Sequence, residues 1–210
     1  MYTEIGFCII HDVIGHREID LLKNEMSNIK SCGSRNLILS NNVISVGAKI
    51  LFKLNARARI GFGYNLSWVN YFDKNKNRNW QVPMHIDEMV PILDESVARN
   101  NGVTEFCIKD GQLYGKSSKV HMELTIAARL SLDDSHLDNG PLIVIPGSHL
   151  GNFKECETPL TTKAGDVIVM SPLLMHASSK MKVCTRRRVM HYNFCSSEIK
   201  QFIGNKQIYA

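Results

Sequence analysis

The segment GPLIVIPGSH, residues 140–149, decides the fold class. Its aliphatic, β-branched centre is bounded by Gly and Pro on both sides, which is typical of a short buried strand. Three strand-like segments surround it: HMELTIAARLSLDD at 121–134, AGDVIVMSPLLMHASS at 164–179 and RRRVMHYNF at 186–194. Short strands separated by Gly, Pro, Asn and Asp predict an antiparallel sandwich or barrel.

The N-terminal part has a different texture. GHREIDLLKNEMSNIKS (15–31) carries apolar residues at helical spacing, and NNVISVGAKILFKL (41–54) is a second helix candidate. EIGFCIIHDVI (4–14) reads as a short strand before them. Early helices and late strands favour a mainly β fold with helices packed outside it.

The middle of the chain contains one more strand and a long mixed segment. RIGFGYNLSWVNYF (59–72) alternates and is rich in aromatic residues, while DKNKNRN (73–79) reads as a polar turn. The stretch 88–119 contains the turn signals Asp110-Gly111 and Gly115 and is a candidate lid, because long connections in compact domains are usually functional.

Composition places the chain among soluble globular proteins. It has 210 residues, 44% hydrophobic and 21% charged, with a net charge of +5. The only basic cluster, CTRRRV (184–189), is too small for a nucleic-acid surface. No apolar run reaches the roughly 18 to 20 residues of a membrane span, and the start lacks a basic signal-peptide region. We expect a cytoplasmic protein of undetermined oligomeric state.

The six cysteines form no CxxC pair and no zinc-finger spacing, so reduced thiols are expected.

The segment QVPMHIDEMVP (81–91) offers a candidate pair of metal ligands, His85 and Asp87, which an extended chain places on one face. The tripeptide alone does not decide, because three similar pairs occur: His136-Leu-Asp138, His16-Arg-Glu18 and His121-Met-Glu123.

Several motifs together resemble the phytanoyl-CoA dioxygenase family of Fe(II)/2-oxoglutarate oxygenases. They are YFDKNKNRNWQVPMHID (71–87), SLDDSHLDNGPLIVIPGSHLGN (131–152), AGDVIVMSPLLMHASS (164–179) and TRRRVMHYNF (185–194), with GFCIIHDVI (6–14) similar to the usual opening. The resemblance covers roughly residues 5 to 195 in the right order. It implies a double-stranded β-helix, a jelly-roll or cupin-like barrel, over 61–195, with a mostly helical flank over 1–60 in one domain of 210 residues.

The resemblance also implies a site. His85 and Asp87 would be the proximal iron ligands and His176 the distal one, binding Fe(II) for use with 2-oxoglutarate and O2. Arg187, eleven residues after His176, would hold the far carboxylate of 2-oxoglutarate, helped by Ser178. Family members commonly have Trp-His-Gln-Asp where this chain has Met-His-Ile-Asp, which keeps both ligands but makes the substrate less transferable.

Some positions stay open at this stage. Arg129 could face the pocket or form a surface ion pair, and Trp80 could be core or pocket wall. His191 and Asn193 share the face of Arg187 by strand periodicity, and they could contact substrate or form a buried polar network. A β-bulge before Arg187 would hand its role to Arg188. His149 is expected to support a turn, and His136 and Asp138 to be solvated.

The resulting hypothesis is a dioxygenase that hydroxylates a small molecule, with release of succinate and CO2. Asp87 favours hydroxylation, because related halogenases have a small residue there so that chloride can bind iron; desaturation and ring formation stay open. A non-catalytic jelly-roll binding module would lose at least one of the ligands or the arginine. A zinc hydrolase would have no use for Arg187.

Overall fold

The computed structural model describes residues 2–29, 31–35, 37, 40–57, 63–152 and 156–204. The helices are α1 (Tyr2–Ile5), α2 (His16–Glu25), α3 (Asn41–Arg57), α4 (Glu95–Asn100) and α5 (Lys119–Glu123), with 3-10 turns η1 (Met26–Asn28) and η2 (Ser148–Leu150). The two long helices fall where the apolar spacing predicted them, and they lie early in the chain.

The strands form three antiparallel sheets. They are β1 (Phe7–Ile10), β2 (Gly33–Ser34), β3 (Tyr64–Asn75), β4 (Val82–His85), β5 (Met89–Pro91), β6 (Thr104–Lys109), β7 (Gln112–Lys116), β8 (Thr125–Ser131), β9 (Leu142–Val144), β10 (Thr158–Leu160), β11 (Val167–Met170), β12 (His176–Ser178) and β13 (Arg186–Ser196). The six-stranded sheet has the order β1-β11-β8-β13-β3-β2, the four-stranded sheet β10-β9-β12-β4, and the small sheet β5-β7-β6.

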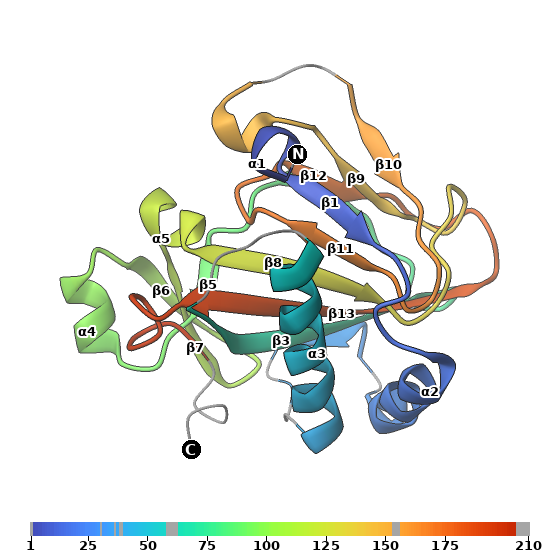
Figure 1. Cartoon of the computed structure of the whole chain (residues 1–210), viewed down its shortest axis with the longest axis horizontal. Helices are drawn as coiled ribbons and strands as arrows, with labels where there is room; N and C mark the ends of the chain where they lie inside the picture. Colours follow the sequence, from blue (N-terminus) through green and yellow to red (C-terminus); the bar gives the residue numbers. More distant parts are fainter. Residues whose placement is uncertain are drawn as a thin grey trace.

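Helices α2 and α3 cover the outer face of the six-stranded sheet (Figure 1). Leu22 of α2 and Ile50 and Leu54 of α3 are fully buried against β3, β8 and β13. On β13 every second residue faces these helices, which explains why Tyr192 and Phe194 are apolar and buried. The outer side of this strand is therefore a helix-covered surface, as the sequence predicted.

The opposite face of the same sheet meets the four-stranded sheet. Ala127 of β8 and Ile168 of β11 pack against Leu142 and Val144 of β9 and Leu160 of β10. Strand β8 is buried at all seven positions because it has helices on one side and the second sheet on the other. Two antiparallel sheets packed face to face confirm the predicted mainly β, jelly-roll fold with flanking helices.

The candidate lid, residues 88–119, is folded into the third sheet with α4 beside it. Val90, Ile92, Ala98 and Val103 from this segment are buried in a cluster with Trp68 of β3 and Phe202. Figure 1 places this small sheet and α4 at one end of the molecule. The segment is thus anchored by an apolar cluster that it shares with β3 and Phe202, and it lies directly after Asp87 in the chain.

Four local expectations need correction. Strand β3 continues to Asn75, so the first part of DKNKNRN is strand, and the tight turn spans only Asn75 to Arg78. His121 lies in helix α5 and does not begin a strand, because Ser118 caps this helix by accepting from the His121 amide. The strand predicted over 4–14 is limited to Phe7–Ile10. The N-terminal flank also supplies both edge strands of the main sheet, β1 and β2.

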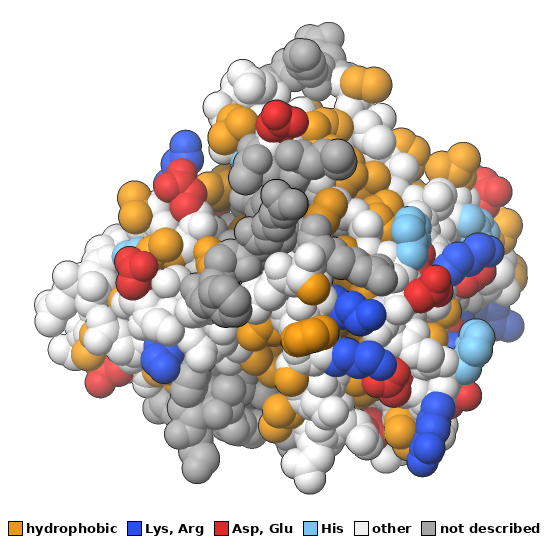
Figure 2. All heavy atoms as spheres, viewed as in Figure 1, with side chains coloured by type: hydrophobic (Ala, Val, Ile, Leu, Met, Phe, Trp, Pro, Cys, Tyr) orange, Lys and Arg blue, Asp and Glu red, His pale blue; other side chains and the backbone are white. Residues whose placement is uncertain are grey.

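The outer surface mixes charges of both signs. Figure 2 shows basic and acidic side chains side by side over α2 and α3, where Lys49 pairs with Glu18 at 2.8 Å. In the described part of the chain, no helix is long and apolar enough to cross a membrane.

Candidate metal and cosubstrate site

Two histidines face each other across neighbouring strands of the four-stranded sheet. The antiparallel pairing of β4 with β12 sets His85 directly opposite His176. The two rings have their centroids 4.2 Å apart and are tilted by 51°. Pro83 is tolerated within β4 because this is an edge strand, where a missing N–H leaves no neighbour unpaired. Strand register therefore brings together two residues that lie 91 positions apart (176 − 85).

The tautomer of both histidines is fixed by the backbone. Nδ1 of His85 lies 2.8 Å from the carbonyl oxygen of Pro83, and Nδ1 of His176 lies 2.8 Å from that of Leu174. A carbonyl oxygen only accepts hydrogen bonds, so each Nδ1 carries the proton and donates it. Each Nε2 is then left with its lone pair, which is the form in which imidazole binds a metal.

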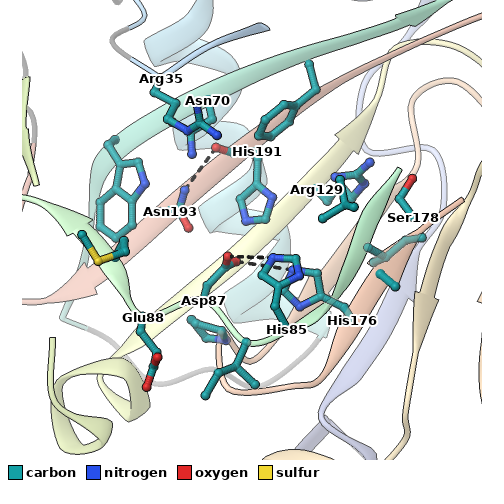
Figure 3. Close-up of a pocket in the computed structure, with 18 of the residues that line it drawn as sticks. Arg35, Asn70, His85, Asp87, Glu88, Arg129, His176, Ser178, His191 and Asn193 are labelled. Atoms are coloured by element: carbon teal, nitrogen blue, oxygen red, sulfur yellow. Dashed lines mark hydrogen bonds and ion pairs between the residues drawn. The ribbon is translucent and has the colours of Figure 1, made fainter. Parts of the chain in front are cut away.

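Asp87 completes the cluster from the loop after β4. Its amide donates to the carbonyl oxygen of Pro172 at 2.9 Å, which ties this loop to the turn before β12. Its Oδ1 atom lies 3.6 Å from Nε2 of His85, and its Oδ2 atom lies 3.7 Å from Nε2 of His176. In Figure 3 the carboxylate points at both rings. One ligand atom from each residue lies within 4.8 Å of the others, which fits a single metal ion.

The electrostatics of the cluster keep the carboxylate charged. Burial by itself raises the pKa of Asp87, but the contact with His85 and the electrostatic effects of the nearby His176 and His191 imidazoles lower it below its usual range. The same carboxylate raises the pKa of His85, whereas burial lowers that of His176. An ionised carboxylate beside two imidazoles is a donor set suited to a divalent transition metal.

A cationic group lies beside Ser178, two residues after His176. Arg187 of β13 is buried, with Nη2 3.5 Å from the hydroxyl of Ser178, and its Nε has no hydrogen-bond partner. Burial, and then the charge of Arg129, lower the pKa of Arg187 to about 9. Arg188 faces away and binds Asp133 through both prongs of its guanidinium, at 2.7 and 2.8 Å. Pairing of β13 with β3 is regular from Arg186 to Asn193, so the register favours Arg187.

Sequence reasoning missed Lys74, the other basic residue at this end of the pocket. It was assigned to a polar turn, but it lies on β3 and its side chain is fully buried. Its ammonium donates to the Ser178 hydroxyl at 2.9 Å and to the Ser179 carbonyl at 2.6 Å. The signal was available: Trp68, Asn70, Phe72 and Lys74 continue one alternating face, and all line the pocket.

The remaining predicted residues line the same pocket, which has a volume of about 330 Å³. Arg129 of β8 and His191 of β13 are buried and face it as cross-strand neighbours. The Asn193 amide donates to the carbonyl oxygen of His191 at 3.2 Å, and Figure 3 shows both residues on the side opposite Ser178. Trp80 forms part of the pocket wall, and the Lys74 ammonium lies 5.1 Å from the centre of its ring. All nine sequence-predicted site residues therefore meet in one pocket; their roles remain predictions.

The pocket lining is rich in positive charge. Its basic residues are Arg35, Lys74, Lys109, Arg129 and Arg187, and its acidic residues are Asp87 and Glu88. Burial lowers the pKa of Arg129 to about 10, against the opposing effect of Asp87. Lys74, Arg129 and Arg187 are buried, and an excess of buried cations over carboxylates is unfavourable unless an anion is bound.

The competing His-x-acid pairs lie elsewhere. His136 and Asp138 are exposed, as expected. His121 contacts Ser117 and the Phe202 ring, and His149 lies against Gly6; neither histidine lines the pocket. Glu18 caps the start of α2 by accepting from the Gly15 amide at 3.0 Å. Among the described residues, His85, Asp87 and His176 are the three that gather as a potential metal site.

Comparison with protein families gives one match. A family model described as Phytanoyl-CoA dioxygenase (PhyH) matches residues 109–189. This span contains His176, Ser178 and Arg187, and it ends before His191.

Comparison with solved structures supports the fold over most of the chain. A crystal structure of HygX from Streptomyces hygroscopicus, with nickel and 2-oxoglutarate bound, has a TM-score of 0.66 at 15% identity, covering 93% of this chain and 84% of that one. SnoN, a non-heme alpha-ketoglutarate-dependent epimerase from nogalamycin biosynthesis, has a TM-score of 0.65 at 15% identity, covering 93% and 78%. AviO1 from Streptomyces viridochromogenes Tue57 has a TM-score of 0.63 at 15% identity, covering 93% and 92%. At this identity the likeness is one of fold.

Proposed function

The chain is PhyH-like, and we propose on that premise that it is an Fe(II)- and 2-oxoglutarate-dependent dioxygenase that hydroxylates a small molecule. The observation that carries the proposal is the set of three ligand atoms: two Nε2 lone pairs fixed by backbone acceptors, and one ionised carboxylate. Two histidines and one carboxylate on one side of an iron leave positions for a 2-oxo acid and for oxygen. The residues present therefore fit the metal.

The basic end of the pocket supports 2-oxoglutarate as the cosubstrate. Arg187 offers a buried guanidinium whose Nε is unpartnered, and Ser178 offers a hydroxyl beside it. A planar guanidinium binds a carboxylate through two parallel hydrogen bonds, which gives both affinity and direction. In this proposal the far carboxylate of 2-oxoglutarate lies against Arg187 while its oxo-acid end reaches the metal held by His85, Asp87 and His176.

When bound, iron with 2-oxoglutarate and O2 supplies the oxidising chemistry, in which the oxo acid becomes succinate and CO2 and the substrate is hydroxylated. The chain contributes orientation and exclusion of water. Asp87 occupies the carboxylate position, which favours hydroxylation. His191, Asn193 and Arg129 present polar groups toward the bound substrate, and Trp80 forms an apolar wall.

The lining favours a polar small-molecule substrate. One HygX structure has nickel, 2-oxoglutarate and hygromycin B bound, so in that protein this fold holds a further small molecule together with 2-oxoglutarate. In this chain the mouth residues Arg35, Lys109 and Glu88 add charge to the polar interior. Residues 88–119 close one side of the pocket, and we propose that they act as its lid and set substrate choice.

The proposal is tested by anaerobic titration of the purified protein with Fe(II) and 2-oxoglutarate. We expect a weak visible charge-transfer band that appears only when both are present. His176→Ala should abolish it, because the distal ligand is lost, while the matched control His136→Ala, at an exposed histidine outside the pocket, should leave it unchanged. A full band in His176→Ala would refute the ligand assignment.

Oxygen-dependent succinate release, coupled to a small-molecule screen, separates the proposal from its alternatives. Succinate formation that a substrate stimulates supports the oxygenase. Metal and 2-oxoglutarate binding without any turnover would favour a non-catalytic jelly-roll binding module. Hydrolysis of a substrate with no requirement for 2-oxoglutarate would favour a zinc hydrolase.

A further inference from the structure

Lys74 is a buried ammonium group without an acidic partner. Its side chain is fully buried, and none of the described acidic side chains forms an ion pair with it. Its hydrogen bonds go to neutral acceptors, the hydroxyl of Ser178 and the carbonyl oxygen of Ser179. Neutral acceptors satisfy the N–H groups but leave the charge uncompensated, and an unpaired buried charge is costly.

A second buried cation lies directly beside it. The pairing of β3 with β13 makes Lys74 and Arg187 cross-strand neighbours, and both point into the pocket. Like charges opposite each other on neighbouring strands repel. Burial, and then the charges of Arg187 and Arg129, lower the pKa of Lys74 to about 7. Without a bound anion the charged form of Lys74 is therefore disfavoured beside Arg187, and a carboxylate bound between the two would favour it.

Both cations converge on one hydroxyl. The Ser178 oxygen lies 2.9 Å from the Lys74 ammonium and 3.5 Å from Nη2 of Arg187. Ser178 donates its own proton to the carbonyl oxygen of Gly140 at 3.0 Å, so the lone pairs of its oxygen face the cations. The guanidinium Nε beside it is buried and has no partner. A carboxylate placed here would contact the guanidinium of Arg187, the ammonium of Lys74 and the hydroxyl of Ser178.

We propose that Lys74 is a second cationic ligand for the far carboxylate of the cosubstrate, and that together with Arg187 it makes the site selective for dicarboxylic 2-oxo acids. The inference rests on the proposed function and adds to it the residue that sets the charge requirement. A purely structural Lys74 would only fasten the end of β12 through Ser179, and it would have no preference among 2-oxo acids.

A pair of ligands distinguishes these two roles. 2-Oxoglutarate and 2-oxopentanoate have the same chain length and the same oxo-acid end, but the second has a methyl group in place of the far carboxylate. Binding of each to the nickel-loaded protein under anaerobic conditions is measured by calorimetry, so that the readout is independent of turnover. The variants are Lys74→Met, Lys74→Gln and the control Lys163→Met, at a largely exposed lysine.

We expect Lys74→Met to lower affinity for 2-oxoglutarate at least tenfold while changing affinity for 2-oxopentanoate by less than about twofold. Lys74→Gln keeps N–H donors for Ser179 but not the charge, so it should give the same selective loss even where the Met variant is unstable. Lys163→Met should behave as the wild type.

The opposing results are equally definite. Parallel loss of affinity for both ligands would assign Lys74 a structural role, and unchanged affinity for 2-oxoglutarate would place the carboxylate elsewhere; either refutes the inference and leaves the proposed function standing. Failure of the nickel-loaded wild type to bind 2-oxoglutarate at all would refute the proposed function and the inference with it.

Discussion

Two neighbouring arginines on β13 should respond in opposite ways to the same conservative substitution. Arg187 faces the pocket with Nε and Nη2 available, whereas Arg188 faces the opposite side and grips Asp133 at 2.7 and 2.8 Å. Lysine keeps the charge of either residue but removes the planar fork. The two substitutions, Arg187→Lys and Arg188→Lys, therefore each remove a bidentate contact while keeping the charge, at neighbouring positions of one strand.

The magnitude follows from the number of donors lost. A carboxylate held by two N–H groups of Arg187 loses one charge-assisted hydrogen bond in Arg187→Lys, worth about 1.5 to 3 kcal/mol. That corresponds to a roughly 10- to 150-fold higher dissociation constant for 2-oxoglutarate. In Arg188→Lys the partly shielded pair with Asp133 weakens, and the free energy of unfolding should fall by about 1 kcal/mol with cosubstrate affinity unchanged.

The assay is calorimetric titration of each nickel-loaded variant with 2-oxoglutarate, together with urea unfolding of the same preparations. The expected pattern is weak binding with near-normal stability for Arg187→Lys, and normal binding with lowered stability for Arg188→Lys. If instead Arg188→Lys loses affinity and Arg187→Lys keeps it, the face assigned to each arginine is wrong.

Three further results are expected. Interactions with Arg188 and Lys23 hold the pKa of Asp133 below its usual value against the effect of burial, so the stability that this carboxylate adds is present at neutral pH and lost as pH falls through its folded pKa; Asp133→Asn should unfold at lower urea than wild type at pH 7, with the gap narrowing by pH 3. Gly140→Ala should lower stability and 2-oxoglutarate affinity together, because the backbone has a φ of +70° and a Cβ would lie 2.4 Å from the Ser179 carbonyl oxygen; a variant equal to wild type by urea unfolding and calorimetry would refute this. Amide hydrogen exchange over residues 88–119 should slow when metal, 2-oxoglutarate and substrate bind, and equal exchange in both states would argue against a lid.

The fold was predictable from sequence because its signals are local. Strands β9 and β11 are short β-branched runs bounded by Gly or Pro, and α2 repeats its apolar residues at helical spacing, so element type follows from nearby residues. Lys74 was misplaced for the same reason. Asp, Lys and Asn normally mark turns, but here long-range pairing with β13 extends the strand through them, and Asp73 is held by Arg186 at 2.9 and 3.0 Å.

The position of the site residues was predictable, but their environment was not. Strand alternation correctly placed Arg187, His191 and Asn193 on one face, and family spacing pointed to His176. The fold of 88–119 escaped because its strands are short and its apolar residues find partners far away, at Trp68 and Phe202. Burial of that kind depends on the assembled core, which no local pattern reports.

The small sheet β5-β7-β6 begins two residues after Asp87 and ends before β8, so in the chain it lies between two strands that carry residues of the candidate site, β4 and β8. It touches the pocket through Glu88, Met89, Lys109 and Tyr114, and its apolar residues pack in a cluster shared with Trp68 of β3 and Phe202. Exchanging this segment would therefore change part of the pocket lining, and the exchange would have to keep its packing on Trp68 and Phe202.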